Sequence, residues 1–179
     1  MMPVIEALAE KVAVSIKKAD SRGTVSVAVM KYALIIVINF TIPVAASLAI
    51  GLVTDAFYWT SLTICAFTLL RAFSGGFHFR SPVLCMIATT VITATPAHFV
   101  LSKNLIILLT IIGLFLIAIL APANIKGYAR MPEKFFPLMK MASIVIVGSN
   151  FFIQSSAFAI LFFAQGLLLI FPFKKEVSL

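Results

Sequence analysis

A histidine and a cysteine lie seven residues apart at a polar break between two apolar stretches, and their types suggest catalysis. The break, residues 71–81, reads Arg-Ala-Phe-Ser-Gly-Gly-Phe-His-Phe-Arg-Ser, and four residues later comes Cys85. Cysteine attacks as the thiolate, and the imidazole of His78 is able to take the thiol proton. The pair therefore predicts nucleophilic catalysis, and we expect neither a metal nor a cofactor.

The residues before the cysteine predict a helix start. Serine is a good N-cap and proline is favoured at the first helical position, so Ser81 and Pro82 should begin a helix. Cys85 then lies near its first turn, where the helix dipole favours negative charge. Seven residues of unbroken helix would separate His78 from Cys85 by about 10.5 Å along the axis. We therefore expect the Gly75–Gly76 pair to turn the chain so that His78 folds back over the helix end.

Other candidate residues have simpler interpretations. Cys65 lies in the middle of an apolar stretch, where a lone cysteine is usually a small buried hydrophobe. His98 is predicted to be a solvated residue near the opposite membrane face. Arg71 and Arg80, taken alone, would be ordinary charges that set membrane topology.

The composition predicts an all-α polytopic integral membrane protein. Of the 179 residues, 62% are hydrophobic and only 11% are charged, whereas soluble domains average about 45–50% and about 25%. The net charge of +8 would suggest a nucleic acid partner in a soluble protein. Here the charges separate hydrophobic runs, so we expect the lipid bilayer as a partner and no nucleic acid.

The N-terminal segment, residues 1–31, is predicted to be cytoplasmic and amphipathic, and it lacks the long apolar run of a cleavable signal peptide. Helical periodicity over residues 3–20 places apolar residues on one face: Val4, Ile5, Leu8, Val12 and Ile16. This helix would either lie on an anionic leaflet or pack on the protein's own loops.

Residues 32–173 are predicted to form one transmembrane domain of about six segments. The first four are expected at 32–53, between Asp55 and Arg71, from Pro82 to about 101, and to about 120 after a tight turn at Lys103 and Asn104. The uncharged stretch 141–173 would be roughly 50 Å long as one helix, so we divide it at 154–156. A single tilted or re-entrant helix is the alternative.

The basic residues predict which side of the membrane each loop faces. With the N-terminus inside and six spans, 13 of the 14 Lys and Arg residues fall on the cytoplasmic side, and only Lys103 falls outside. The positive-inside rule therefore favours cytoplasmic termini, a cytoplasmic basic loop at 121–140 and a cytoplasmic tail at 174–179. The site at 71–85 would face the same side.

The motif Arg71-x-x-Ser74-Gly75-Gly76-x-His78-x-x-Ser81-x-x-x-Cys85 resembles the signature of the accessory gene regulator B (AgrB) family of membrane cysteine endopeptidases. Length, basic charge, the amphipathic N-terminus and the position of the motif are also similar. The run after the fourth span, residues 121–126, resembles the family's later Pro-containing loop, although an acidic residue often found there is missing.

The resemblance implies that His78 deprotonates Cys85, which cleaves the C-terminal tail from a small AgrD-like propeptide through a thioester. A Cys or Ser within the propeptide would then close a thiolactone or lactone quorum-sensing peptide. Arg71 would pair with an acidic group of the propeptide or orient the loop. The Gly75–Gly76 pair would shape the turn, and its N–H groups could stabilise the oxyanion.

Further expectations remain open. Ser74 and Ser81 complete the motif as residues that bind substrate or shape the loop. A catalytic dyad is favoured over a triad, with Asp20 and Glu133 as the carboxylates to test. A homodimer is plausible for the family. The alternative function is a small non-enzymatic membrane transporter or scaffold, which would place ionisable groups deep in its spans.

Overall fold

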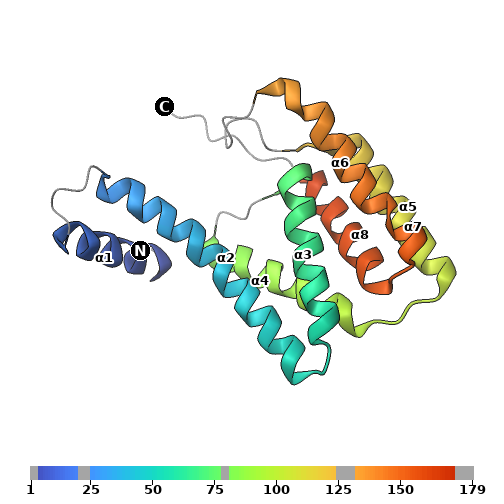
Figure 1. Cartoon of the computed structure of the whole chain (residues 1–179), viewed down its shortest axis with the longest axis horizontal. Coiled ribbons are helices and arrows are strands. Elements are labelled where there is room, and N and C mark those ends of the chain that lie inside the picture. The colour runs from blue at the N-terminus through green and yellow to red at the C-terminus, as the bar shows by residue number, and fades with distance from the viewer. Residues whose placement is uncertain (1–3, 20–24, 78–80, 124–131, 172–179) are drawn as a thin grey trace.

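The computed structural model describes residues 4–19, 25–77, 81–123 and 132–171. Within these ranges every regular element is a helix, which confirms the predicted all-α membrane fold (Figure 1). Four helices, α3, α5, α6 and α8, form a bundle, while α1 and the first half of α2 project away from it. The elements in chain order are α1 (Val4–Ala19), α2 (Val27–Val53), α3 (Phe57–Ser74), α4 (Pro82–Ala94), the 3-10 helix η1 (Thr95–His98), α5 (Lys103–Leu120), the 3-10 helix η2 (Glu133–Phe135), α6 (Phe136–Gly148), α7 (Asn150–Ile153) and α8 (Ser156–Ile170).

All six predicted apolar stretches contain helix. Three helical stretches are long and apolar enough to cross a bilayer, namely Val27–Val53, Lys103–Leu120 and Phe136–Ile153, and two shorter apolar ones are Pro82–His98 and Ser156–Ile170. The sixth, α3, carries Arg71 in its last turn. These helices indicate membrane association.

Several predicted boundaries were wrong. The first span begins at Val27 instead of residue 32, because the Ser26 side chain caps the helix by accepting from the Val29 N–H at 3.3 Å. The third span leaves α-helix at Ala94, since Pro96 cannot donate the backbone hydrogen bond that would continue it.

The chain from Lys103 also differs from expectation. Lys103 and Asn104 were expected in a tight turn but are the first two residues of α5, with Ser102 at the N-cap position. On the far side of the predicted basic loop, α6 starts at Phe136, so the helix takes up residues that we had assigned to the loop.

The predicted division of residues 141–173 is confirmed. Helix α7 ends at Ile153, Gln154 adopts a left-handed conformation with φ of 52°, and α8 begins at Ser156. The buried amide of Asn150 stabilises this turn, because its nitrogen donates to the Ser155 carbonyl at 3.2 Å and its oxygen accepts from the Ser155 N–H at 3.0 Å. The same nitrogen donates to Thr110 on α5 at 3.0 Å.

Helices α5 and α8 pack closely through glycine. A Cβ added at Gly113 would lie 3.1 Å from backbone atoms of Phe162 and Phe163, and one at Gly166 would lie 3.5 Å from the Gly113 Cα. Such small residues let membrane helices approach each other. The buried core lies beside this contact and consists of Phe67, Leu70, Ile117, Ala121, Val147, Leu161, Phe162 and Leu169.

The C-terminal ends of α3, α5 and α8 meet at one end of the bundle. The Ala123 N–H, just after α5, donates to the carbonyl of Ser74 at the end of α3, at 2.9 Å. Phe77, just after α3, donates to the carbonyl of Leu168 on α8 at 3.2 Å. In Figure 1 the red end of α8 lies beside the C-terminal end of α3. This convergence positions the segment that carries the motif.

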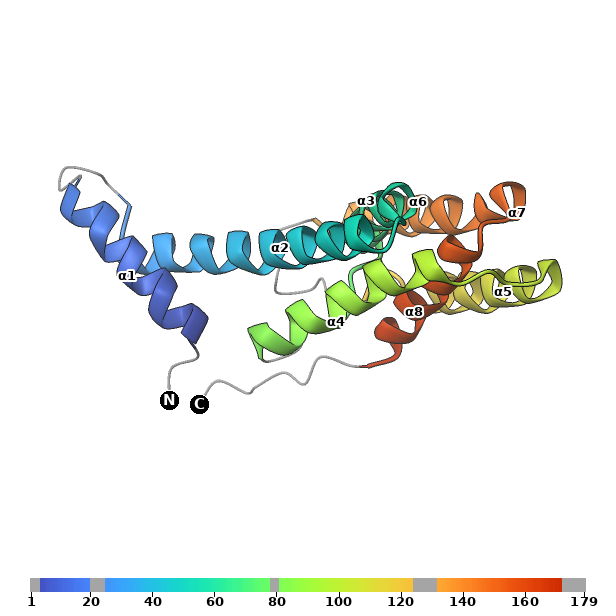
Figure 2. The ribbon, with the colours of Figure 1, turned by 90° about the horizontal axis from the view of Figure 1, so that it is seen from below.

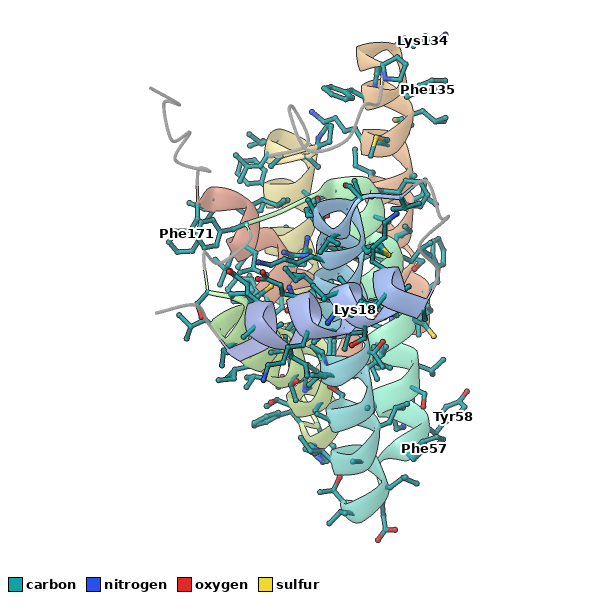
Figure 3. All side chains as sticks on the ribbon, turned by 90° about the vertical axis from the view of Figure 1, so that its left-hand side faces the viewer. Lys18, Phe57, Tyr58, Lys134, Phe135 and Phe171 are labelled. Carbon is teal, nitrogen blue, oxygen red and sulfur yellow. The ribbon has the colours of Figure 1, made fainter. Side chains whose placement is uncertain are left out.

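The two ends of the molecule differ in their exposed residues. Phe57 and Tyr58, at the start of α3, lie at the opposite end from Lys134 and Phe135 (Figure 3). Tyr58 and Trp59 are exposed, and their rings pack edge to face with their centroids 5.6 Å apart. Aromatic residues at a helix start are typical of a membrane interface.

Helix α1 packs on the N-terminal part of α2 (Figure 2), where Lys31 forms a salt bridge with Glu10 at 2.9 Å. The predicted apolar face divides into two. Ile5 is buried, whereas Leu8, Val12 and Ile16 are exposed, and the other buried residues of α1 are Ala9 and Ala13, which were not assigned to that face. The helix therefore packs on another helix through small residues, and contact of the exposed face with a leaflet stays a prediction.

Candidate active site

Cys85 lies near the start of α4, as the sequence predicted. Pro82 is the first helical residue, and the Ser81 side chain accepts from the Leu84 N–H at 3.5 Å. The Cys85 N–H donates to the Ser81 carbonyl at 3.1 Å, which is the first backbone hydrogen bond of the helix. The thiol is free and partly exposed. The positive end of the α4 dipole therefore lies next to a reachable sulfur.

The helix before the motif is interrupted as expected, though three residues later than we assigned. Helix α3 continues through Arg71 and ends at Ser74, so the start of the predicted active-site loop is helical. Gly75 and Gly76 have φ values of 70° and 140°, which side chains on L-residues rarely allow. His78 and Arg80 lie outside the described residues, so the fold-back of the imidazole stays a prediction.

The three backbone N–H groups that the structure describes after α3 all donate to protein carbonyls. Gly75 donates to the Arg71 carbonyl at 3.0 Å, Gly76 to Ala123 at 3.2 Å and Phe77 to Leu168 at 3.2 Å. A donor that already holds a protein carbonyl is not aimed at a substrate oxygen. This geometry argues against our expectation that the glycine N–H groups stabilise an oxyanion, and it favours their role in shaping the loop.

The later Pro-containing loop contacts the glycine pair directly. Gly75 and Ala123 form an isolated parallel bridge, in which Ala123 donates to Ser74 and accepts from Gly76. The Ala121–Pro122 peptide bond that leads into this bridge is cis. Two segments that the family resemblance singled out separately are therefore one structural unit.

Arg71 orients the loop. Its Nη2 donates to the carbonyl of Phe77 at 2.6 Å, its Nη1 donates to the Gln165 side-chain oxygen at 3.5 Å, and its guanidinium lies 5.5 Å from the centre of the Phe67 ring. The negative dipole ends of α3, α5 and α8 favour a cation at this position. Arg71 is also close enough to Cys85 for the two to interact electrostatically.

Sequence reasoning missed the contacts of Gln165. This residue of α8 is fully buried, and its amide nitrogen donates to the Ser74 hydroxyl at 2.9 Å and to the Gly75 carbonyl at 2.8 Å. Ser74 is also fully buried, and its hydroxyl donates to the Gly75 carbonyl at 3.3 Å. The signal in the sequence was a lone amide in an apolar helix.

The structure separates the other candidates from this site. Cys65 is exposed on α3 instead of buried, because the buried positions of that helix lie on another face. For a membrane helix, that exposed face is one that acyl chains would cover. His98 is exposed in η1, beyond the far end of α4 from Cys85, with its Nε2 3.4 Å from the Thr54 hydroxyl. This position agrees with the prediction for His98.

No metal centre is visible in the described part of the chain, where no three His, Cys, Asp or Glu side chains could hold an ion together. The two carboxylates proposed for a triad are not placed. Asp20 and the Glu133 side chain both lie outside what the structure describes.

The comparisons with known proteins agree with the motif. No curated protein and no solved structure matches the chain. A family model described as Accessory gene regulator B matches residues 8–173, which is nearly the whole chain. The chain therefore belongs to the AgrB family, which implies a part in the processing of quorum-sensing peptides by the accessory gene regulator system.

Proposed function

We propose that the chain is a membrane-embedded cysteine endopeptidase that removes the C-terminal tail of a small AgrD-like propeptide and promotes cyclisation of the remainder. The observation that carries the proposal is the position of Cys85, near the start of α4, with its backbone N–H donating to the Ser81 carbonyl of the helix cap at 3.1 Å. A helix start is a place where negative charge is favoured, and cysteine attacks a carbonyl as the thiolate. Family membership supports the same chemistry.

The proposed reaction has two steps. His78 takes the thiol proton, and the Cys85 sulfur attacks a peptide carbonyl of the propeptide. The C–N bond breaks, the imidazolium returns its proton to the leaving amine, and the acyl group remains on sulfur as a thioester. A Cys or Ser side chain of the propeptide then attacks the thioester, which forms the ring and releases the Cys85 thiol.

The loop between α3 and α4 would hold His78 for this reaction. Its supports are the Arg71 guanidinium, the Gln165 amide and the bridge to Ala123. The cyclisation step requires that the internal nucleophile reacts faster than water, so a fixed geometry at a membrane interface would favour the ring over hydrolysis. The proposed location is the cytoplasmic face, on the basis of the distribution of Lys and Arg.

Co-expression with a candidate precursor encoded beside the gene tests the proposal. Mass spectrometry should detect the released tail and an acyl adduct on Cys85. Cys85→Ala and His78→Ala should each abolish cleavage while leaving membrane insertion intact, whereas Cys65→Ala should process normally. Normal processing by either of the first two variants would exclude the assigned roles and favour the transporter or scaffold alternative.

A further inference from the structure

The Gln165 side chain uses both ends of its amide at the same place. Its nitrogen donates to the Ser74 hydroxyl and the Gly75 carbonyl, at 2.9 and 2.8 Å, and its oxygen accepts from Arg71 at 3.5 Å. A glutamine amide offers two N–H donors and one carbonyl acceptor. Exchanging the oxygen and nitrogen would set N–H groups against a guanidinium and an oxygen against a carbonyl, so this orientation is the one that the surroundings permit.

The neighbouring residues show why glutamine suits this position. A glutamate would pair with Arg71 but has no N–H for the Gly75 carbonyl when ionised. A methionine would fill similar space with neither donor nor acceptor. An asparagine, shorter by one methylene, would not reach across to the loop from α8. The contacts therefore depend on the length and on the chemistry of the side chain.

A second buried amide in the bundle gives a useful contrast. Asn150 also makes three hydrogen bonds, but its partners are Thr110 and the backbone of Ser155, in the turn before α8. Those contacts stabilise a helix connection. The partners of Gln165 are Arg71, Ser74 and Gly75, and all of them lie in the segment that leads to His78.

We infer that Gln165 is a positioning residue for the proposed peptidase reaction, and that it acts by holding Arg71 and the Ser74–Phe77 backbone in one arrangement. The inference rests on the proposed function. Gln165 does not touch the reacting atoms in this account. Its loss should therefore affect the rate of the chemical step more than the binding of the propeptide.

Two variants of Gln165 and one control variant separate positioning from simple destabilisation, all tested in the full-length Cys65→Ala chain in membranes. Gln165→Met should lower kcat by about tenfold to a hundredfold, with KM changed less than about threefold, because displacement of a reacting group by about 1 Å has that effect. Gln165→Glu should lower kcat as well. Thr110→Val removes a buried hydrogen-bond partner from Asn150, away from the loop, and should retain the parent kcat.

Alkylation of Cys85 by iodoacetamide gives a readout that needs no propeptide. Gln165→Glu keeps an acceptor for the Arg71 guanidinium, whereas Gln165→Met keeps none, so the two variants should differ in the Cys85 alkylation rate by about threefold or more. A purely structural role would change both variants alike, in proportion to the fraction of folded protein.

Three results would overturn the inference. The first is a parent-like kcat in Gln165→Met. The second is a kcat that falls by the same factor in Thr110→Val as in Gln165→Met. The third is equal alkylation rates in the Met and Glu variants. The proposed function fails separately, and takes the inference with it, if Cys85→Ala still processes the propeptide. An inactive Cys85→Ala together with a fully active Gln165→Met rejects the inference about Gln165 and leaves the proposed function standing.

Discussion

Replacement of Gly76 by alanine should disable the loop without unfolding the bundle. Gly76 is buried and has a φ of 140°, a region that is essentially restricted to glycine. A Cβ at this position would lie 3.2 Å from the Arg71 Nη1 and 3.3 Å from the Gln165 amide nitrogen. Both groups are already held by hydrogen bonds to the loop, so neither has a free direction in which to move.

The free-energy cost of Gly76→Ala to the native loop conformation has two contributions. The backbone conformation costs a residue other than glycine about 1–3 kcal/mol. Displacement of the guanidinium weakens its 2.6 Å hydrogen bond to Phe77, and a hydrogen bond to a charged group contributes about 1.5–3 kcal/mol. The lower limits together give about 2.5 kcal/mol, which reduces the population of the native loop by about 60-fold.

The assay compares the rate of propeptide processing in membranes with thermal unfolding in detergent. Gly76→Ala should lower the rate by about 60-fold and change the unfolding midpoint little, because the strain is relieved by local rearrangement of the loop. Gly148→Ala is the matched control, since a Cβ there meets nothing within 4 Å, and it should process normally. A Gly76→Ala variant that processes within twofold of the parent would refute this account of the loop.

Three further predictions concern charge and packing. Arg71→Lys should lose most processing activity, because the planar guanidinium donates to two acceptors at once and an ammonium does not reproduce that geometry. Parent-like processing by this variant would contradict the prediction. Gly113→Leu should lower the unfolding midpoint or cause aggregation in size-exclusion chromatography, since a Cβ would already lie 3.1 Å from the backbone of Phe162. An unchanged midpoint would show that α5 and α8 can separate freely. Glu10→Gln should change stability by less than about 1 kcal/mol, as exposed ion pairs contribute little, and a larger loss in thermal unfolding would indicate that the pair with Lys31 anchors α1.

The position of Cys85 could be predicted from sequence because helix starts obey local rules. Ser81 and Pro82 fix where α4 begins, and the first turn then follows by counting. The division at Gln154 was predictable for a similar reason, since an uncharged run of that length exceeds the thickness of one bilayer. The first conclusion needed only the residues next to Cys85, and the second needed only the length of the uncharged run.

The supports of the loop were not predictable in this way. Gln165 and Gly75 are 90 residues apart in the chain, and nothing in either local sequence indicates that they meet. The exposure of Cys65 was missed for another reason. Lipid is as apolar as a protein core, so the outward face of a membrane helix has no polar pattern that distinguishes it from the inward face.

The contacts that α8 makes with the loop have a consequence for biogenesis. Synthesis proceeds from the N-terminus, so His78 and Cys85 enter the bilayer long before Gln165 and Leu168 leave the ribosome. A half-made chain would carry both residues without the hydrogen bonds that α8 makes to Gly75 and Phe77. If the chain is the peptidase proposed above, cleavage would then start only when translation is finished, and neighbouring proteins at the translocon would be spared.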